Sequence, residues 1–211
     1  MTYIFNTTIG ANRVDTDAPE WNSEFLVSGE NGRKTLEIVD AWRSGTRPTL
    51  PDEMPKLLVA DKPRKIWPDT FMTTNGLLVV NGDVRAVIEK LDPNTHQFFP
   101  LTFRTKRGVI IDGPWFAMNV SKKQDTLAMG RCHLVFSEKY PDTGNLFHED
   151  TKDGEITVDP ALQSKLNLWR ESRVEMSLLG SNALVLELEK QGLSFFKKSA
   201  KAAEYNMLQP S

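Results

Sequence analysis

Cysteine is almost absent from this chain of 211 residues, since Cys132 is the only one. A single cysteine excludes an intramolecular disulfide and favours a reducing compartment. Long hydrophobic runs are also absent: no window approaches the roughly 18 apolar residues of a membrane helix. The first residues do not combine a basic start with an apolar stretch, as a secretory signal does. We therefore expect a cytoplasmic protein that does not bind a membrane.

The chain has no excess of basic residues. It contains 26 Lys and Arg against 28 Asp and Glu, and its pI is about 6.0. Proteins that bind the phosphate backbone carry basic patches, so we expect no nucleic-acid partner. Hydrophobic residues make up 39% of the chain, which is enough for a packed core.

Regular patterns are weakest near the N-terminus, where prolines are frequent. Residues 23–29 indicate a short strand, and residues 33–45 permit a short helix or a strand. We expect residues 1–65 to form an irregular or β subregion that packs on a core domain formed by residues 66–211.

The middle of the chain predicts a strand followed by a helix and further strands. Residues 76–80 are an apolar run of strand length. Residues 81–93 then show a helical apolar stripe, with Asn81 or Asp83 as the cap and a proline as the stop. Strands are predicted next over residues 97–105, 113–122 and 131–138.

The C-terminal part repeats this pattern. Residues 173–199 indicate a strand, a helix capped by Ser181 or Asn182, a stop at Gly192 and a second strand. Both copies end in a Phe-Phe pair, and residues 202–207 suggest a last short helix. The prediction is an α+β fold with a mixed or mainly antiparallel sheet and a few short helices packed on it. The repeat suggests a duplicated β-α-β unit.

Residues that could catalyse a reaction are few. Besides Cys132 the candidates are three histidines, His96, His133 and His148. Cys132 and His133 are adjacent in a predicted strand, where neighbours point to opposite faces, so they do not pair with each other. A pair between Cys132 and another histidine stays open, although a buried core cysteine is the commoner case.

Motifs for metals and cofactors are missing. The sequence has no Cys-x-x-Cys, no His-Glu-x-x-His, no glycine-rich nucleotide loop and no Gly-x-Ser-x-Gly. Residues 148–159 resemble a calcium loop but lack its closing glutamate. We expect no catalytic residues, no metal and no cofactor.

The stretch LDPNTHQFFPL, residues 91–101, leads the predicted helix back into a strand. We interpret His96, Phe98, Phe99 and Pro100 as a structural motif. Pro100 suggests an edge position or a bulge, because its nitrogen donates no hydrogen bond. The alternative is that His96 is a general base in a pocket lined by the phenylalanines.

Negative charge gathers between residues 135 and 160, where seven acidic residues stand against two basic ones. Such a run is usually a solvated loop. It could also be an acidic docking face for a basic partner, because charge complementarity speeds encounter. We predict that the partner-binding residues are Glu149, Asp150, Asp153 and Glu155.

Residues 68–196 resemble a large family of bacterial immunity proteins, which are encoded beside the toxins of polymorphic, contact- or secretion-delivered systems. The resemblance rests on Asp69 and Phe71, the strand 76–80, the turn Leu91-Asp92-Pro93, the HQFFP run at 96–100 and the aromatic strand 115–120. Asn81-Gly82 departs from the Ser-Glu-like helix start of the family. The resemblance implies tight binding of one cognate toxin and no catalysis.

The leading hypothesis is therefore an immunity protein, or antitoxin, that neutralises a cognate toxin by direct contact. The setting would be competition between bacteria, with a toxin delivered for example by type VI secretion. One alternative is a small enzyme that uses His96 or Cys132. Another is a non-catalytic scaffold protein of a secretion system, marked by a stable homo-oligomer, although an immunity protein could also form one.

Overall fold

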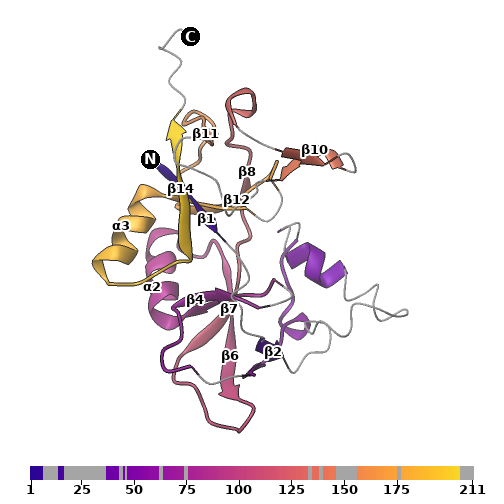
Figure 1. Ribbon diagram of the computed structural model, residues 1–211, viewed down its shortest axis with the longest axis vertical. Coiled ribbons are helices and arrows are strands. Elements are labelled where there is room, and N and C mark those ends of the chain that lie inside the picture. The colour runs from indigo at the N-terminus through magenta and orange to yellow at the C-terminus, as the bar shows by residue number, and fades with distance from the viewer. Residues whose placement is uncertain are drawn as a thin grey trace. The chain divides into compact units, whose positions relative to one another are not determined.

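The structure is a computed structural model. It describes residues 1–6, 14–16, 37–42, 45, 47–61, 64–73, 76–132, 135–137, 140–145, 156–174 and 177–204. The chain divides into two compact units (Figure 1): unit 1 comprises Met1–Thr7 and Lys122–Ser211, and unit 2 comprises Thr8–Ser121. This grouping differs from the division at residue 65 expected from the sequence, which stays a prediction.

Unit 2 contains a six-stranded mixed sheet in the order β2-β3-β6-β7-β5-β4. β3 runs parallel to β6, and the other neighbouring pairs are antiparallel. The strands are β2 (Val14–Thr16), β3 (Leu57–Ala60), β4 (Thr70–Met72), β5 (Leu78–Asn81), β6 (Gln97–Thr105) and β7 (Trp115–Asn119), and the 3-10 helix η3 (Pro51–Glu53) precedes β3.

Helix α2 (Gly82–Leu91) begins directly where β5 ends. Asn81 is its N-cap, and the Asn81 Oδ1 atom accepts a hydrogen bond of 2.9 Å from the Val84 N–H. The side chains of Val84, Val87 and Ile88 are buried, as the stripe predicted. The expected strand, cap and helix are therefore confirmed here.

Both faces of the unit 2 sheet are covered. One face packs on the helical residues 37–42, whose Trp42 shares a buried cluster with Ala117. Toward the other face, Arg85 of α2 lies 4.4 Å from the ring centroid of Phe116. Because Phe116 and Ala117 are neighbours in β7, they point to opposite faces. Two covered faces explain why all of β7 is buried.

Unit 1 contains a second six-stranded sheet in the order β11-β14-β1-β13-β12-β8, and β1 (Thr2–Asn6) lies between β13 and β14, antiparallel to both. Its other strands are β8 (Lys123–Gln124), β11 (Thr157–Val158), β12 (Leu168–Glu171), β13 (Leu178–Ser181) and β14 (Lys197–Glu204). A separate hairpin pairs β9 (Val135–Ser137) with β10 (Tyr140–Asn145), and the 3-10 helix η4 spans Met129–Arg131.

Helix α3 (Asn182–Lys190) follows β13 as α2 follows β5. Ser181 is the N-cap, and its hydroxyl accepts a hydrogen bond of 3.2 Å from the Leu184 N–H. Gly192, at φ 69°, follows the C-cap Gln191. This left-handed conformation suits glycine, so both predicted ends of the helix are confirmed.

The two units share one arrangement of strands. The order β3-β6-β7-β5-β4 in unit 2 corresponds to β11-β14-β1-β13-β12 in unit 1, with α2 and α3 in equivalent places. The first pair of each series is parallel and the next three are antiparallel. The duplicated β-α-β unit is therefore present, as part of a larger five-stranded repeat.

The same hydrogen bonds recur at the end of the strand before each helix. The backbone N–H and side-chain Nδ2 of Asn81 donate to the carbonyl and carboxylate oxygens of Asp69, both at 2.9 Å. The N–H and hydroxyl of Ser181 donate to the carbonyl and side-chain oxygens of Asn167, at 2.9 and 2.7 Å. Each pair holds the strand end to the segment before the neighbouring strand.

The order along the chain differs by one strand. In unit 2, β7 follows β6 through a hairpin, whereas its counterpart β1 opens the chain in unit 1. Unit 1 is thus a circular permutation of the arrangement in unit 2. No local pattern in the sequence predicts this change.

Several sequence-based predictions are wrong in detail. The two Phe-Phe pairs are not equivalent, because residues 98–99 lie within β6 whereas residues 195–196 precede β14. Cys132 is not in a strand: it follows η4, and the strand predicted over 131–138 begins at Val135. Residues 202–204 belong to β14 rather than to a last helix, because they pair with other strands. The strand predicted over 23–29 lies outside the described residues.

Candidate functional site

The four acidic residues predicted to bind a partner lie outside the described part of the chain. They are Glu149, Asp150, Asp153 and Glu155. His133 and His148 lie outside it as well. The structure therefore does not test the acidic docking face, which stays a prediction.

The motif at residues 96–100 connects α2 and β6 to a neighbouring segment. The His96 side chain is fully buried, and its Nε2 lies 3.7 Å from the Asp92 Oδ2. The Gln97 side chain accepts a hydrogen bond from the Thr49 N–H at 2.9 Å and donates one to the Thr49 carbonyl at 3.1 Å. Asn119 of β7 adds bonds to the Thr49 hydroxyl and to Gln97 Oε1, at 3.0 and 3.1 Å.

The other residues of this motif contact buried or partly buried side chains. The ring of Phe98 lies 5.3 Å from the Arg85 guanidinium, and Phe99 packs on Trp42 with centroids 6.2 Å apart. Pro100 pairs with β7, but β3 joins β6 only from Thr102 onward. On that side Pro100 is locally at an open edge, where the missing N–H loses no hydrogen bond.

Cys132 is half-buried next to β11. Its Sγ lies 3.4 Å from the carbonyl oxygens of Ala128 and Thr157. Burial raises the pKa of the thiol, which opposes the thiolate form that a nucleophile needs. His96 belongs to unit 2 and Cys132 to unit 1.

Unit 1 holds a buried carboxylate that the sequence did not point to. Glu171 Oε2 accepts hydrogen bonds from the N–H and hydroxyl of Thr126, at 3.1 and 2.7 Å, and Oε1 accepts one from the Ser172 N–H at 3.0 Å. Burial raises the pKa of Glu171, and these hydrogen bonds oppose the rise. Burial also lowers the pKa of the adjacent Arg170 to about 10. The bonds tie β12 to the segment after β8, which is a structural role.

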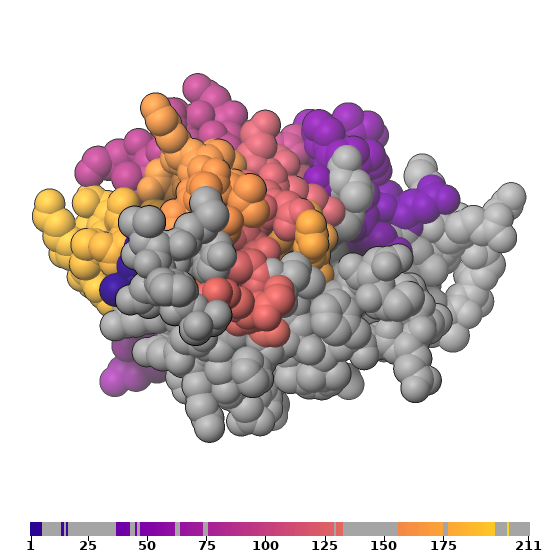
Figure 2. All heavy atoms as spheres, turned by 90° about the horizontal axis from the view of Figure 1, so that it is seen from above, coloured from indigo at the N-terminus to yellow at the C-terminus, as the bar shows by residue number. Residues whose placement is uncertain are grey.

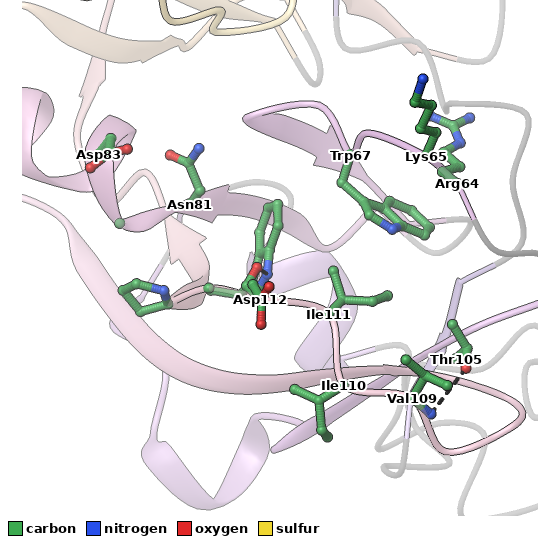
Figure 3. A pocket seen from close by; sticks show the side chains of 14 residues that line it. Arg64, Lys65, Trp67, Asn81, Asp83, Thr105, Val109, Ile110, Ile111 and Asp112 are labelled. Atoms are coloured by element: carbon green, nitrogen blue, oxygen red, sulfur yellow. Dashed lines mark hydrogen bonds between the residues drawn. The ribbon is translucent and has the colours of Figure 1, made fainter.

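Unit 2 has a cavity of about 600 Å³ (Figure 3). Three segments form its walls: the segment of Arg64, Lys65 and Trp67, the junction of β5 with α2, and the connection from β6 to β7. Trp67 reaches in from the first segment and Ile111 from the third. The walls thus come from parts of the chain that are distant in sequence.

Large apolar side chains face solvent at or near this cavity: Val109 and Ile110 line it, and Ile66 stands between the lining residues Lys65 and Trp67 in the sequence. Ile66 is 80% exposed, Val109 63% and Ile110 59%. Exposed apolar side chains that gather at one place mark an interaction site more often than isolated ones do. The cluster is suited to contact with another molecule.

Charged side chains stand at both ends of the cavity. Arg64 stacks over the ring of Trp67, with its Cζ 5.4 Å from the centroid. Lys65 lies beside Arg64, while Asp83 lies at the α2 end (Figure 3). Within the described residues, Arg64 and Lys65 form no ion pair. Both are therefore available to an acidic group of a partner.

The β6–β7 connection is held by its own hydrogen bonds. The Thr105 N–H donates to the Val109 carbonyl at 2.8 Å, and the Val109 N–H donates to the Thr105 hydroxyl at 3.2 Å. Gly108 makes the turn at φ 84°, and the Trp115 indole N–H donates to the Asp112 carbonyl at 2.8 Å. These bonds preorganise the wall, which lowers the cost of binding.

The side chains that line the cavity differ in chemistry. They are aromatic, aliphatic, basic and carboxylic, with Asn81 as the amide and Thr105 as the one hydroxyl. The buried Thr105 hydroxyl already accepts a hydrogen bond within the turn. In the part of the chain that the structure describes, no three His, Cys, Asp or Glu side chains gather as metal ligands.

The comparison with known families agrees with the resemblance seen in the sequence. The model described as "Immunity protein family (Imm11)" matches residues 12–200, so the chain belongs to this immunity protein family. The family implies a role in immunity to a toxin. No curated protein matches the chain. None of the described helices has the length and apolar character to cross a bilayer.

Proposed function

We propose that this protein binds a cognate antibacterial toxin and neutralises it by direct, stoichiometric contact. The observation that carries the proposal is the family match over residues 12–200. The protein acts without catalysis and without a cofactor. Its toxin is the effector of a polymorphic system, such as one delivered by type VI secretion, and neutralisation takes place in the cytoplasm during competition between bacteria.

The surface of unit 2 supports a role in binding. Natural inhibitor complexes bury on the order of 1,600 Å² in total, and a few aromatic or charged anchors dominate the affinity. Ile66, Trp67 and Ile110 offer anchors of this kind next to a cavity. Ile66 and Ile110 are exposed and Trp67 is partly exposed, so a second protein can reach them, whereas His96 is buried.

The test is co-expression of the full chain with the product of the adjacent toxin gene. Growth rescue and a stable complex are expected for the wild type. The same rescue is expected for Cys132→Ala and for His96→Gln, provided that circular dichroism shows both variants to be folded. If a folded variant of either residue loses rescue but keeps the complex, the protein is an enzyme. If the wild type forms no complex, direct inhibition is wrong.

Two surfaces are candidates for the contact with the toxin: the surface of unit 2 around the cavity, and the predicted acidic docking face. Glu149, Asp150, Asp153 and Glu155 remain our proposal for a basic toxin, because many toxic enzymes that act on nucleic acids are basic. Their reversal to lysine should slow association at low salt. Unchanged association would remove this surface from the proposal.

A further inference from the structure

We infer that one face of unit 2 docks an acidic segment of the toxin that also carries an apolar side chain. We call it the hairpin face and define it by Arg64, Lys65, Ile66, Trp67, Arg107, Val109 and Ile110. The inference rests on the proposed function, because it names the surface that a toxin would occupy. The apolar side chain would enter the cavity beside Trp67, and the acidic groups would lie over Arg64 and Lys65.

The internal repeat shows that the hairpin is not required by the fold. In unit 2 the β6–β7 connection carries Arg107, Val109 and Ile110. In unit 1 the counterpart strands, β14 and β1, are far apart in the chain, yet they pair in the same antiparallel way. The five-stranded arrangement is therefore built once with this connection and once without it. The exposed residues of the hairpin need a reason other than the architecture.

Exposure is concentrated on this face. Seven large hydrophobic side chains are exposed in the described part of the chain, and three of them are Ile66, Val109 and Ile110. Val109 and Ile110 line the cavity in Figure 3, and Ile66 lies between Lys65 and Trp67, two lining residues of the other segment. A fold that only had to be stable in water would replace them with polar residues at little cost, so burial by a partner explains them.

The basic residues of the hairpin face indicate that its partner is acidic. Among the described residues, Arg64, Lys65 and Arg107 have no acidic partner, whereas Lys106 forms an ion pair with Asp61. The Arg64–Trp67 stack holds the guanidinium on an aromatic surface, a combination that is frequent at binding hot spots. Cations next to a cavity that is partly lined by Trp67, Val109 and Ile110 suit carboxylates next to an apolar side chain.

The experiment uses the full chain and the purified toxin domain from the adjacent gene, inactivated in its own catalytic site. Binding is measured by surface plasmon resonance for the wild type, Ile110→Asp and the double variant Arg64→Glu/Lys65→Glu. We expect about a hundredfold weaker binding for Ile110→Asp, since a carboxylate would be buried in the contact. The double variant should associate about tenfold more slowly at low salt and recover toward wild type at high salt.

Matched controls come from the same place in the other unit. Leu162 and Lys165 lie on the β11–β12 connection, which is the counterpart of the connection that carries residues 64–67. Residues of this connection are at the surface (Figure 2), and Leu162 is 54% exposed. Leu162→Asp and Lys165→Glu should bind within about threefold of the wild type, because isolated surface changes have small effects.

The outcomes separate this inference from the proposed function. If the wild type binds and the face variants bind like the controls, the hairpin face is wrong while direct inhibition stands. If the wild type does not bind at all, both are wrong. If the face variants lower self-association of the chain, measured by light scattering, and leave toxin binding unchanged, the face joins two copies of this protein and the inference is overturned.

Discussion

Replacing Gln97 by methionine should lower the stability of unit 2. Its side chain takes part in three hydrogen bonds of 2.9 to 3.1 Å. Two of these bonds engage the backbone N–H and carbonyl of Thr49, and the third comes from Asn119. Methionine has nearly the same length but neither donates nor accepts strongly, so Gln97→Met removes the bonds with little change in packing.

The expected loss follows from these bonds. Each contributes about 0.5–1.5 kcal/mol net, so the loss is roughly 2–4 kcal/mol in the free energy of unfolding. The lower end applies if water replaces the bonds to Thr49, and the upper end applies if the N–H of Thr49 is left without an acceptor.

Urea unfolding followed by tryptophan fluorescence measures this loss. Gln191→Met is the control, because Gln191 makes one exposed hydrogen bond, to Glu187 at 3.1 Å. The control should change the free energy by less than about 0.5 kcal/mol. If Gln97→Met stays as close to the wild type as the control does, then Gln97 does not clamp the Thr49 segment.

Three further predictions concern unit 1. Burial raises the pKa of Glu171 above its unfolded value, so the folded state binds the proton more tightly. The wild type should therefore lose stability relative to Glu171→Gln as the pH rises from about 4.3 through the raised pKa. Unfolding at several pH values measures this difference. If the wild type instead gains stability relative to the variant, the hydrogen bonds outweigh burial. Gly180→Ala should cost about 1–3 kcal/mol, because the added Cβ would meet the ring of Phe5. Gly130→Ala, with open space around the new Cβ, is its control, and equal stability of the two variants would contradict the contact. Burial raises the pKa of Cys132, so iodoacetamide at pH 7.5 should alkylate the native protein at least about tenfold more slowly than the urea-unfolded protein, and equal rates would refute the assignment.

Local signals predicted the two strand-helix-strand segments well. Asn81 and Ser181 are cap residues just before apolar stripes, and Gly192 stands where a left-handed residue ends a helix. Each of these signals acts within one or two turns, so no distant contact can override it easily. The α+β fold class follows from the same segments.

The permuted sheet could not be predicted, because its contacts join the two ends of the chain. Tyr3 in β1 is 179 positions from Asn182, whose side chain accepts its hydroxyl bond. β14 was mistaken in part for a helix because its residues 202–204 are Ala-Ala-Glu, which favour helix until they are paired in a sheet.

The cavity on unit 2 was missed because its walls come from separate segments. The charge of single stretches of sequence points instead to the acidic residues between 135 and 160. One signal was present: residues 109–111 are Val-Ile-Ile directly after a Lys-Arg-Gly turn, where polar residues are usual. Only the structure brings them next to Trp67.

The permutation also sets an order of events during synthesis. β1 is translated before its neighbours β13 and β14, and all the strands of unit 2 lie between them in the chain. Ile4 and Phe5 are buried in the folded protein, but their partners in β13 are translated only about 170 residues later. A chain released before β13 would contain every strand of the unit 2 sheet and an unpaired apolar strand at its start. Such a product would be prone to aggregation, which couples the survival of each new molecule to completion of its final strands.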